Sequence, residues 1–147
     1  MTEPLRIRVQ PPKAMAVALL ETAKLPTEDL REDMLQHFFY AGSDGSPQGM
    51  VGLELLGEEA LLRSLVVDER VRGAGLGKLL VEHAEIHAVE CGVKSLYLLT
   101  TTAESFFRRL NYARIDRAAA PPTIRQTTEF AGLCPASSAL MMKPLQR

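Results

Sequence analysis

Residues 66–81 constrain the fold of this chain more than any other stretch. They contain the apolar end of a strand, a short polar turn, glycines at positions 73, 75 and 77, and the start of a helix. The first backbone N–H groups of a helix have no partner inside the helix, and the helix dipole adds partial positive charge behind them. Glycine lets an anion approach the main chain closely. The stretch therefore predicts a phosphate-binding turn, flanked by the cations Arg72 and Lys78.

The spacing of the glycines excludes two common phosphate-binding motifs. A Walker-type loop needs glycine where Arg72 stands and serine or threonine where Leu79 stands. A dinucleotide-binding fingerprint that starts at Gly73 needs its third glycine at the position of Lys78. The pattern that remains is Arg-x-x-Gly-x-Gly over residues 72–77. The alternative is a strand-to-helix turn that binds no ligand.

Composition limits the classes of partner. Lys and Arg total 17 against 18 Asp and Glu, so the net charge of −1 gives no electrostatic reason to expect nucleic acid or an anionic membrane. The longest apolar run, residues 14–20, is far shorter than the ~20 residues of a membrane span. Two cysteines, Cys91 and Cys134, make no disulfide framework. These features predict one globular domain over residues 1–147, located in the cytoplasm.

Two helices are predicted before the sheet. Residues 13–24 are rich in Ala and Leu and predict the first helix. Thr27, followed by acidic residues, is the expected N-cap of the second helix. The apolar face of this second helix consists of residues at helical spacing: Leu30, Met34, Leu35 and Phe38.

Turn residues divide the rest of the chain into strands and helices. Strands are predicted at residues 5–9, 37–41, 49–56, 60–67, 93–99, 112–116 and 139–142, the last as an edge strand that would allow a homodimer to form. Helices are predicted at 76–91, 103–110 and 123–130. Because the helix 76–91 connects strands 60–67 and 93–99, these two strands are expected to pair in parallel. The buried stripe of that helix is predicted to be Leu76, Leu79, Leu80, Ala84, Ala88 and Cys91.

The motif at residues 72–77 closely resembles the acyl-CoA pyrophosphate loop of the GNAT superfamily of N-acetyltransferases. Residues 106–112, Phe-Phe-Arg-Arg-Leu-Asn-Tyr, are similar to the family's Phe-Tyr-x-x-Leu-Gly-Phe segment. The resemblance covers essentially the whole chain after residue 45. It implies an α/β fold with a mixed, mostly antiparallel sheet of about six to seven strands, helices on both faces, and a parallel strand pair that splays apart.

Two further stretches resemble narrower groups within the superfamily. Residues 98–102, Leu-Leu-Thr-Thr-Thr, are similar to the acetyltransferase part of amino-acid N-acetyltransferases such as N-acetylglutamate synthase. The tail over residues 118–138 looks like the small GNAT proteins encoded beside arsenic-resistance genes. Together they imply an acetyl-CoA-dependent enzyme that moves an acetyl group directly to the amine of a small molecule, such as an amino acid or its analogue. The alternative is a non-catalytic, regulatory module that binds acetyl-CoA.

The resemblance also implies which residues hold the coenzyme. One departure is Phe107, because many members carry a proton-donating tyrosine there; Ser105, Thr102 or Tyr112 could donate instead. A second is Asn111 in place of glycine, which is tolerable because Asn accepts left-handed backbone angles. The expected acetyl-CoA contacts are Leu65, Val66, Val67, Arg72, Gly73, Ala74, Gly75, Leu76, Gly77, Lys78, Phe107 and Arg108.

The residues themselves suggest acceptor-side chemistry on two strands. Glu54 is a carboxylate among apolar neighbours and is the candidate general base; the alternative is that it points outward to solvent. Arg63 and Ser64 lie on strand 60–67, where one of them should face the substrate and an arginine could hold a carboxylate.

Two remaining sets of residues could bind metals. His83, His87 and Cys91 recur every four residues along one helix, but the zinc-protease pattern needs glutamate where Ala84 stands, so packing is expected and no metal. Cys134, before Pro135, is expected to be a buried structural cysteine, with a reactive or arsenic-binding thiol as the alternative.

Overall fold

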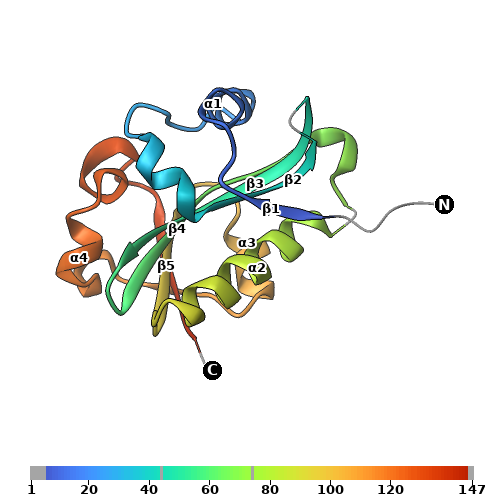
Figure 1. Ribbon diagram of the computed structural model, residues 1–147. Helices are drawn as coiled ribbons and strands as arrows, with labels where there is room; N and C mark the ends of the chain where they lie inside the picture. The colour runs from blue at the N-terminus through green and yellow to red at the C-terminus, as the bar shows by residue number, and fades with distance from the viewer. Residues whose placement is uncertain (1–5, 44, 74, 146–147) are drawn as a thin grey trace. The chain divides into compact units, whose positions relative to one another are not determined.

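The computed structural model describes residues 6–43, 45–73 and 75–145. Seven strands form one sheet in the order β1-β2-β3-β4-β5-β7-β6 (Figure 1). The strands are β1 (Ile7–Val9), β2 (Phe38–Ser43), β3 (Ser46–Leu56), β4 (Glu59–Val67), β5 (Ser95–Thr100), β6 (Ala113–Ile115) and β7 (Ala139–Pro144). The α-helices are α1 (Lys13–Thr22), α2 (Leu76–Glu90), α3 (Glu104–Arg109) and α4 (Pro122–Arg125). The predicted mixed α/β sheet is confirmed.

Both pairing directions occur in the sheet. β1 pairs with β2, β2 with β3, β5 with β7, and β6 with β7, all antiparallel. β4 pairs with β5 in parallel, through Glu59–Leu61 and Ser95–Tyr97, as the strand–helix–strand order predicted. β7 lies between β5 and β6, so the prediction that it is an edge strand is wrong. The homodimer that was expected to form through an exposed β7 edge loses that basis. The physical reason is that the short β6 pairs with the side of β7 that faces away from β5, so β6 and not β7 is the last strand of the sheet.

The chain divides into two compact units. Unit 1 contains the chain up to Leu53 together with Ser64–Ala84, and unit 2 contains Glu54–Arg63 together with the chain from Glu85 onward. The elements β3, β4 and α2 each contribute residues to both units. A single domain over residues 1–147 remains a prediction.

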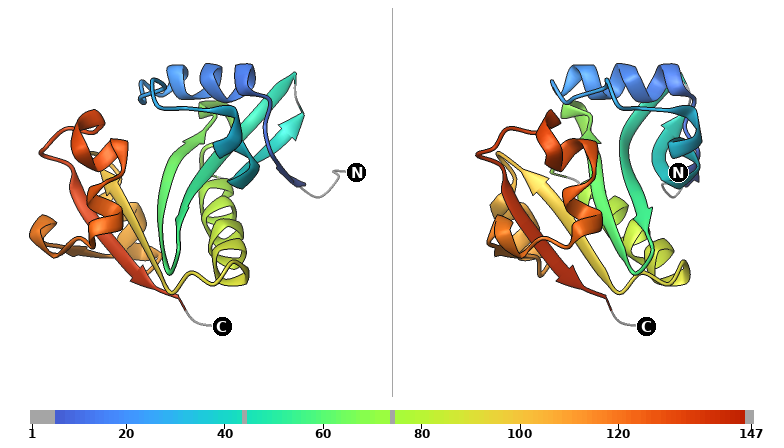
Figure 2. Two further views of the ribbon diagram at one scale, coloured as in Figure 1. Left: turned by 60° about the vertical axis from the view of Figure 1, so that its left-hand side comes forward. Right: turned by 90° about the vertical axis from the view of Figure 1, so that its left-hand side faces the viewer.

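In unit 1, successive side chains of the strands point to opposite faces. Tyr40, Met50 and Val66 are buried in a core with α1. A Cβ on Gly49 would lie 3.0 Å and 3.1 Å from the side chains of Leu80 and Leu76, so α2 begins against the other face. Figure 2 shows α1 and the start of α2 on opposite sides of β2 and β3.

In unit 2, the short helix α4 packs over β4, β5 and β7. Its Ile124 is completely buried in a core with Leu61, Tyr97, Ala120 and Leu140. The predicted helix 123–130 is wrong in extent, since α4 ends at Arg125 and a separate π-helical turn follows at Glu129–Leu133. The hydroxyl of Thr127 donates to the Ile124 carbonyl and accepts from the Phe130 N–H. This side chain competes with the helical backbone and interrupts the helix.

The second predicted helix is also wrong. Residues 32–37 form a short 3₁₀ helix, Glu32–His37, and β2 begins at Phe38. Arg31, in the extended region, donates its N–H to the Met34 sulfur, and the Thr27 backbone carbonyl accepts from the Leu30 N–H. The burial of its apolar face was nevertheless predicted correctly: Leu30, Leu35 and Phe38 are buried, and Met34 packs against them.

The stripe predicted for α2 is correct at four positions and wrong at two. Leu76, Leu80, Ala84 and Ala88 are buried, but Leu79 is 48% exposed and Cys91 is exposed. Leu79 lies about 140° around the helix from Ala84, and Cys91 follows the last helical residue. Gly92 ends the helix with a positive φ of 87°.

Candidate functional site: a phosphate-type turn and a buried arginine cluster

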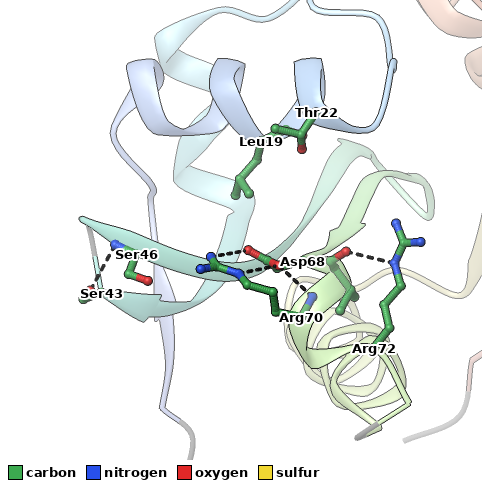
Figure 3. A network of polar contacts seen from close by, with 8 residues as sticks. Leu19, Thr22, Ser43, Ser46, Asp68, Arg70 and Arg72 are labelled. Carbon is green, nitrogen blue, oxygen red and sulfur yellow. Dashed lines mark hydrogen bonds and ion pairs between the residues drawn. The ribbon is translucent and has the colours of Figure 1, made fainter.

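In unit 1, Asp68 anchors the turn that follows β4. Its Oδ1 accepts from the Arg70 backbone N–H at 2.9 Å and from Arg70 Nε at 3.1 Å, and its Oδ2 lies 2.8 Å from Arg70 Nη2 (Figure 3). The Asp68 N–H donates to the Gln48 carbonyl at 2.8 Å. The Arg70 guanidinium and backbone N–H lower the pKa of Asp68 to about 2. The start of the turn is therefore held by hydrogen bonds within the turn and by one hydrogen bond to β3.

The glycines of the turn have left-handed backbone. Gly73 has a φ of +87° and Gly75 a φ of +83°, which non-glycine residues adopt only with strain. A Cβ built on either glycine meets no atom within 4 Å, so the backbone angle and not crowding requires glycine. α2 starts at Leu76, one residue beyond Gly75. Ala74, another predicted coenzyme contact, lies outside the described residues.

Cations flank this turn. The Arg72 Nε donates to the Val67 carbonyl at 3.2 Å (Figure 3). The Arg72 Nη1 lies 4.0 Å from the Glu69 carboxylate. The Arg72 side chain is still 60% exposed, and Lys78 is exposed on the first turn of α2. An open main chain at a helix start with two nearby cations can bind an anion.

A groove of about 1050 Å³ adjoins the turn within unit 1. The groove is lined by α1, by the β2–β3 connection, and by the end of β4 with the residues that follow it. Val66, in this lining, is buried, whereas Leu65 and Val67 are half-buried. The groove has room for part of a ligand larger than phosphate.

In unit 2, Arg63 is the centre of a buried ionic cluster. Its Nη1 donates to Glu54 Oε2 at 2.9 Å, and its Nη2 lies 3.9 Å from Glu129 Oε1. The Arg63 side chain is 0% exposed, against 19% for Glu54 and 10% for Glu129. Glu54 is half-buried, and its carboxylate binds the buried guanidinium.

The backbone beside this cluster is strained. Ser64, next to Arg63 in β4, has a φ of +60° and is 8% exposed. Such angles cost about 1–3 kcal/mol in a non-glycine residue and concentrate at functional sites. Glu129 was missed by sequence reasoning, because a glutamate that follows the polar residues 125–128 carries no motif.

The predicted coenzyme contacts Phe107 and Arg108 lie on α3. Phe107 is 5% exposed, and its ring lies edge-on to Phe106 and Tyr112 at centroid distances of 5.0 Å and 5.5 Å. Arg108 pairs with Glu104 at 2.7 Å. Asn111 has a φ of +74°, as its replacement of glycine predicted.

Tyr112, one alternative proton donor, is held by its neighbours. Its hydroxyl donates to Glu85 Oε2 at 2.8 Å, and Lys143 Nζ binds the same carboxylate. Burial, with the nearby Glu85 charge, raises the pKa of Tyr112 far above its ordinary value. The hydroxyl is therefore a poor proton donor near neutral pH.

The remaining candidates have packing or surface environments. His83 packs edge-on against Phe39 at 4.8 Å, and His87 Nε2 lies 3.6 Å from the exposed Cys91 Sγ. Across residues 6–43, 45–73 and 75–145, no group of three or more His, Cys, Asp or Glu side chains is arranged to hold a metal ion. Cys134 is half-buried. The described helices are all too short or too polar to cross a membrane.

Comparisons with known proteins agree with this fold. Residues 10–112 match the model of the acetyltransferase (GNAT) family. An uncharacterised N-acetyltransferase of Chlorobaculum tepidum is 35% identical over 97 residues, and the match covers 63% of this chain and 62% of the relative. The chain thus spans less than two thirds of that relative's length.

Two solved structures share the fold at low sequence identity. N-acetylglutamate synthase from Neisseria gonorrhoeae, complexed with coenzyme A and N-acetyl-glutamate, has a TM-score of 0.81 at 20% identity, and the similarity covers 100% of this chain and 36% of the synthase chain. Rv2747 from Mycobacterium tuberculosis, complexed with CoA, has a TM-score of 0.76 at 18% identity, with coverage of 98% and 100%. By its family-model match, supported by this shared fold, the chain belongs to the acetyltransferase (GNAT) family.

Proposed function

We propose that this protein is an acetyl-CoA-dependent N-acetyltransferase that acetylates the amine of a small molecule, with an amino acid or its analogue as the preferred class. Family membership and the N-acetyltransferase relative support the reaction. The synthase solved with an acetylated amino acid supports the acceptor class. The resemblance of the tail to proteins encoded beside arsenic-resistance genes remains a prediction, as does the cytoplasmic location.

One observation carries the coenzyme part of this proposal: two left-handed glycines with open space in front of them stand directly before α2. The pyrophosphate is proposed to bind backbone N–H groups of residues 72–77, with Arg72 and Lys78 adding positive charge. The pantetheine arm is proposed to pair with Leu65, Val66 and Val67 as an added strand would. The Val66 N–H would then stabilise the thioester oxyanion. Phe107 and Arg108 are further proposed contacts.

The proposed reaction needs an amine, a base and a thiolate leaving group. The ammonium first loses a proton to Glu54, directly or through water. The amine nitrogen then forms a bond to the thioester carbon, the C–S bond breaks, and the second proton passes from nitrogen to solvent water as the amide forms. The thiolate takes a proton from solvent, and Glu54 returns its proton to water. No metal takes part in these steps.

The absence of a tyrosine at position 107 does not prevent this reaction. A thiol has a pKa of about 8.5, so the thiolate is a tolerable leaving group near neutral pH. The geometry of Tyr112 disfavours it as the substitute acid, which leaves Ser105 or Thr102. On the acceptor side, Arg63 and Ser64 are the proposed substrate residues, and Arg63 contributes by holding the Glu54 carboxylate.

Calorimetry with coenzyme A tests the turn. Gly75→Ala should weaken coenzyme A binding about tenfold or more, because a left-handed alanine costs about 1–3 kcal/mol and the turn will shift to relieve that strain. Gly57→Ala is the matched control: Gly57 has a φ of +80°, also meets no atom within 4 Å, and lies in the β3–β4 connection. The control should lose similar stability and keep its affinity. Absence of coenzyme A binding by the unmodified protein would overturn the proposal.

Thiol release separates the enzyme from a non-catalytic module. Phe107 is the observation that favours such a module, because its buried ring has no proton to give. With acetyl-CoA and a panel of amines, acceptor-dependent thiol release supports the enzyme. Coenzyme binding without such release from any amine would support the regulatory module.

A further inference from the structure

The cluster of Arg63 with Glu54 and Glu129 contains an acid that family resemblance did not suggest. Three segments of unit 2 supply it: the end of β3, the middle of β4 and the π-helical turn Glu129–Leu133. The turn is kinked at Gly132, whose φ of 160° and ψ of −14° are not helical. The neighbouring left-handed angle at Ser64 is a sign of a constrained site that is independent of the ion pairs.

Hydrogen bonds within the tail hold Glu129 in place. The Glu129 carbonyl accepts from the Cys134 N–H at 3.0 Å, and the Ala131 N–H donates to the Thr127 carbonyl at 2.9 Å. Thr127 in turn donates to the Ile124 carbonyl at 2.7 Å. The Glu129 side chain is therefore directed at Arg63 by a folded segment and not by a mobile loop end.

Stability alone gives a weak reason to bury these three charges. Replacing a buried ion pair by apolar side chains is often neutral or stabilising, because each buried charge loses its hydration. The neighbourhood of Arg63 is otherwise suited to apolar packing, since Leu61 of the same strand face lies in the core with Ile124. A ligand that needs charge at this position would explain the cluster.

The exposures of the three side chains indicate which charge a ligand would meet. The Arg63 side chain is 0% exposed, so its guanidinium is not accessible to a substrate carboxylate. The two carboxylate side chains keep 19% and 10% exposure. Glu54 Oε2 binds Arg63, while Oε1 has no polar partner among the described residues. Carboxylate oxygen is the acceptor that an ammonium group requires.

We propose that Glu54 and Glu129, held by Arg63, bind the ammonium group of the acceptor, so that the substrate class is small cationic amines whether or not they carry a carboxylate. This inference rests on the proposed function and assigns Glu129 as a specificity-determining residue. Arg63 is a positioning residue, because it acts by holding the two carboxylates. An amino acid is then one member of the class, recognised by its amine.

Matched pairs of acceptors test this proposal. Leucine is compared with isopentylamine, and glutamate with 4-aminobutyrate, by steady-state thiol release. The KM of each amine should stay within about tenfold of that of its amino acid, since removing a carboxylate removes no contact with the cluster. A loss of a hundredfold or more in both pairs would overturn the proposal, because the site would then bind the carboxylate.

Glu129→Gln tests the charge itself with nearly unchanged shape. It should raise the acceptor KM about ten- to hundredfold, the effect of one lost charge-assisted hydrogen bond, while kcat falls less. Glu129→Asp should recover part of the loss. Glu59→Gln is the matched control: Glu59 is another half-buried acid of unit 2, bound to Thr123 at 2.9 Å, and its removal should leave the acceptor KM unchanged.

Coenzyme A affinity, measured for every variant, separates failure of this proposal from failure of the proposed function. Unchanged coenzyme affinity in Glu129→Gln shows that the variant is folded, and an unchanged acceptor KM then overturns the ammonium site. If the unmodified protein releases no thiol with any amine, binding of isopentylamine is measured by NMR titration. Binding that weakens in Glu129→Gln supports the site without the reaction, and no binding overturns it.

Discussion

The turn after β4 and the Arg63 cluster both pair arginine with carboxylates, but in opposite environments. At the turn, Arg70 is 77% exposed and Asp68 21% exposed, and the two residues are close in sequence. In the cluster, Arg63 is 0% exposed, and its partners lie nine residues before it and 66 residues after it. Solvent screens the first pair and leaves it weak. Desolvation makes the second arrangement costly to break. Similar ion pairs therefore have different roles in this protein: one shapes an exposed turn, and the other holds charge inside the protein.

Arg63→Met should cause the largest fall in the free energy of unfolding. A small loss would contradict the difference between the two regions. The substitution leaves the half-buried carboxylate of Glu54 and the buried carboxylate of Glu129 without their guanidinium, so the free energy of unfolding should fall by about 3–5 kcal/mol. Arg70→Met is the matched substitution at the turn, where only a small loss is expected because the Arg70 guanidinium is exposed to solvent. Urea denaturation measures both. Equal losses in the two variants would mean that burial does not distinguish the two regions.

Tyr112→Phe should cause the next largest loss of stability. It extends the comparison to the partly buried carboxylate of Glu85. Losing the hydrogen bond to Glu85 should cost about 1.5–3 kcal/mol at pH 7. Tyr97→Phe is the control, since it also removes a hydroxyl from a buried tyrosine and keeps the ring. The Tyr97 hydroxyl has no hydrogen-bond partner among the described residues, so the loss of unfolding free energy should be much smaller.

The same variant has a defined pH dependence. The pKa of Tyr112 is raised in the folded protein above its ordinary value of 10.0. Its contribution to stability is therefore complete below pH 10 and is lost as the pH rises above it, because only the unfolded chain ionises there. Thermal denaturation from pH 8 to 11 should show a smaller alkaline loss for Tyr112→Phe than for the unmodified protein. Parallel curves would contradict the buried hydrogen bond.

Asp68→Asn should have the smallest effect and sharpens the description of the turn. Asparagine caps a helical turn about as well as aspartate and loses only the charge interaction with the exposed Arg70, so the melting temperature at pH 7 should fall only slightly. The pKa of Asp68 is lowered from 3.8 to about 2, so its contribution is present above pH 4 and is lost as the pH falls toward 2. An NMR titration of the Asp68 carboxyl group measures this pKa. A value near 3.8 would mean that the Arg70 contacts do not persist in solution.

Sequence reasoning succeeded where neighbouring residues decide the structure. The glycine pattern predicted a strand, a turn and a long helix, and the left-handed angles of Gly73, Gly75 and Asn111 agree with it. It failed where a single side chain redirects the backbone, as Thr127 does after α4. It also placed β7 at the edge of the sheet, because strand order depends on pairings between distant segments.

The candidate site divides in the same way. Arg72, Gly73 and Gly75 were predicted from one contiguous motif. Glu54 and Arg63 were singled out separately, without any sign that they contact each other. Glu129 had no motif to mark it, because its importance arises only when the tail packs over β4.

The sequence by itself determined the family, the parallel strand pair and the glycine turn at the start of α2. These depend on local backbone preference and on the alternation of apolar residues, which adjacent positions encode. Only the tertiary structure decided which charges of the Arg63 cluster stay partly exposed. Burial of Arg63 between Glu54 and Glu129 follows from packing among residues up to 75 positions apart, and desolvation acts only once that packing exists.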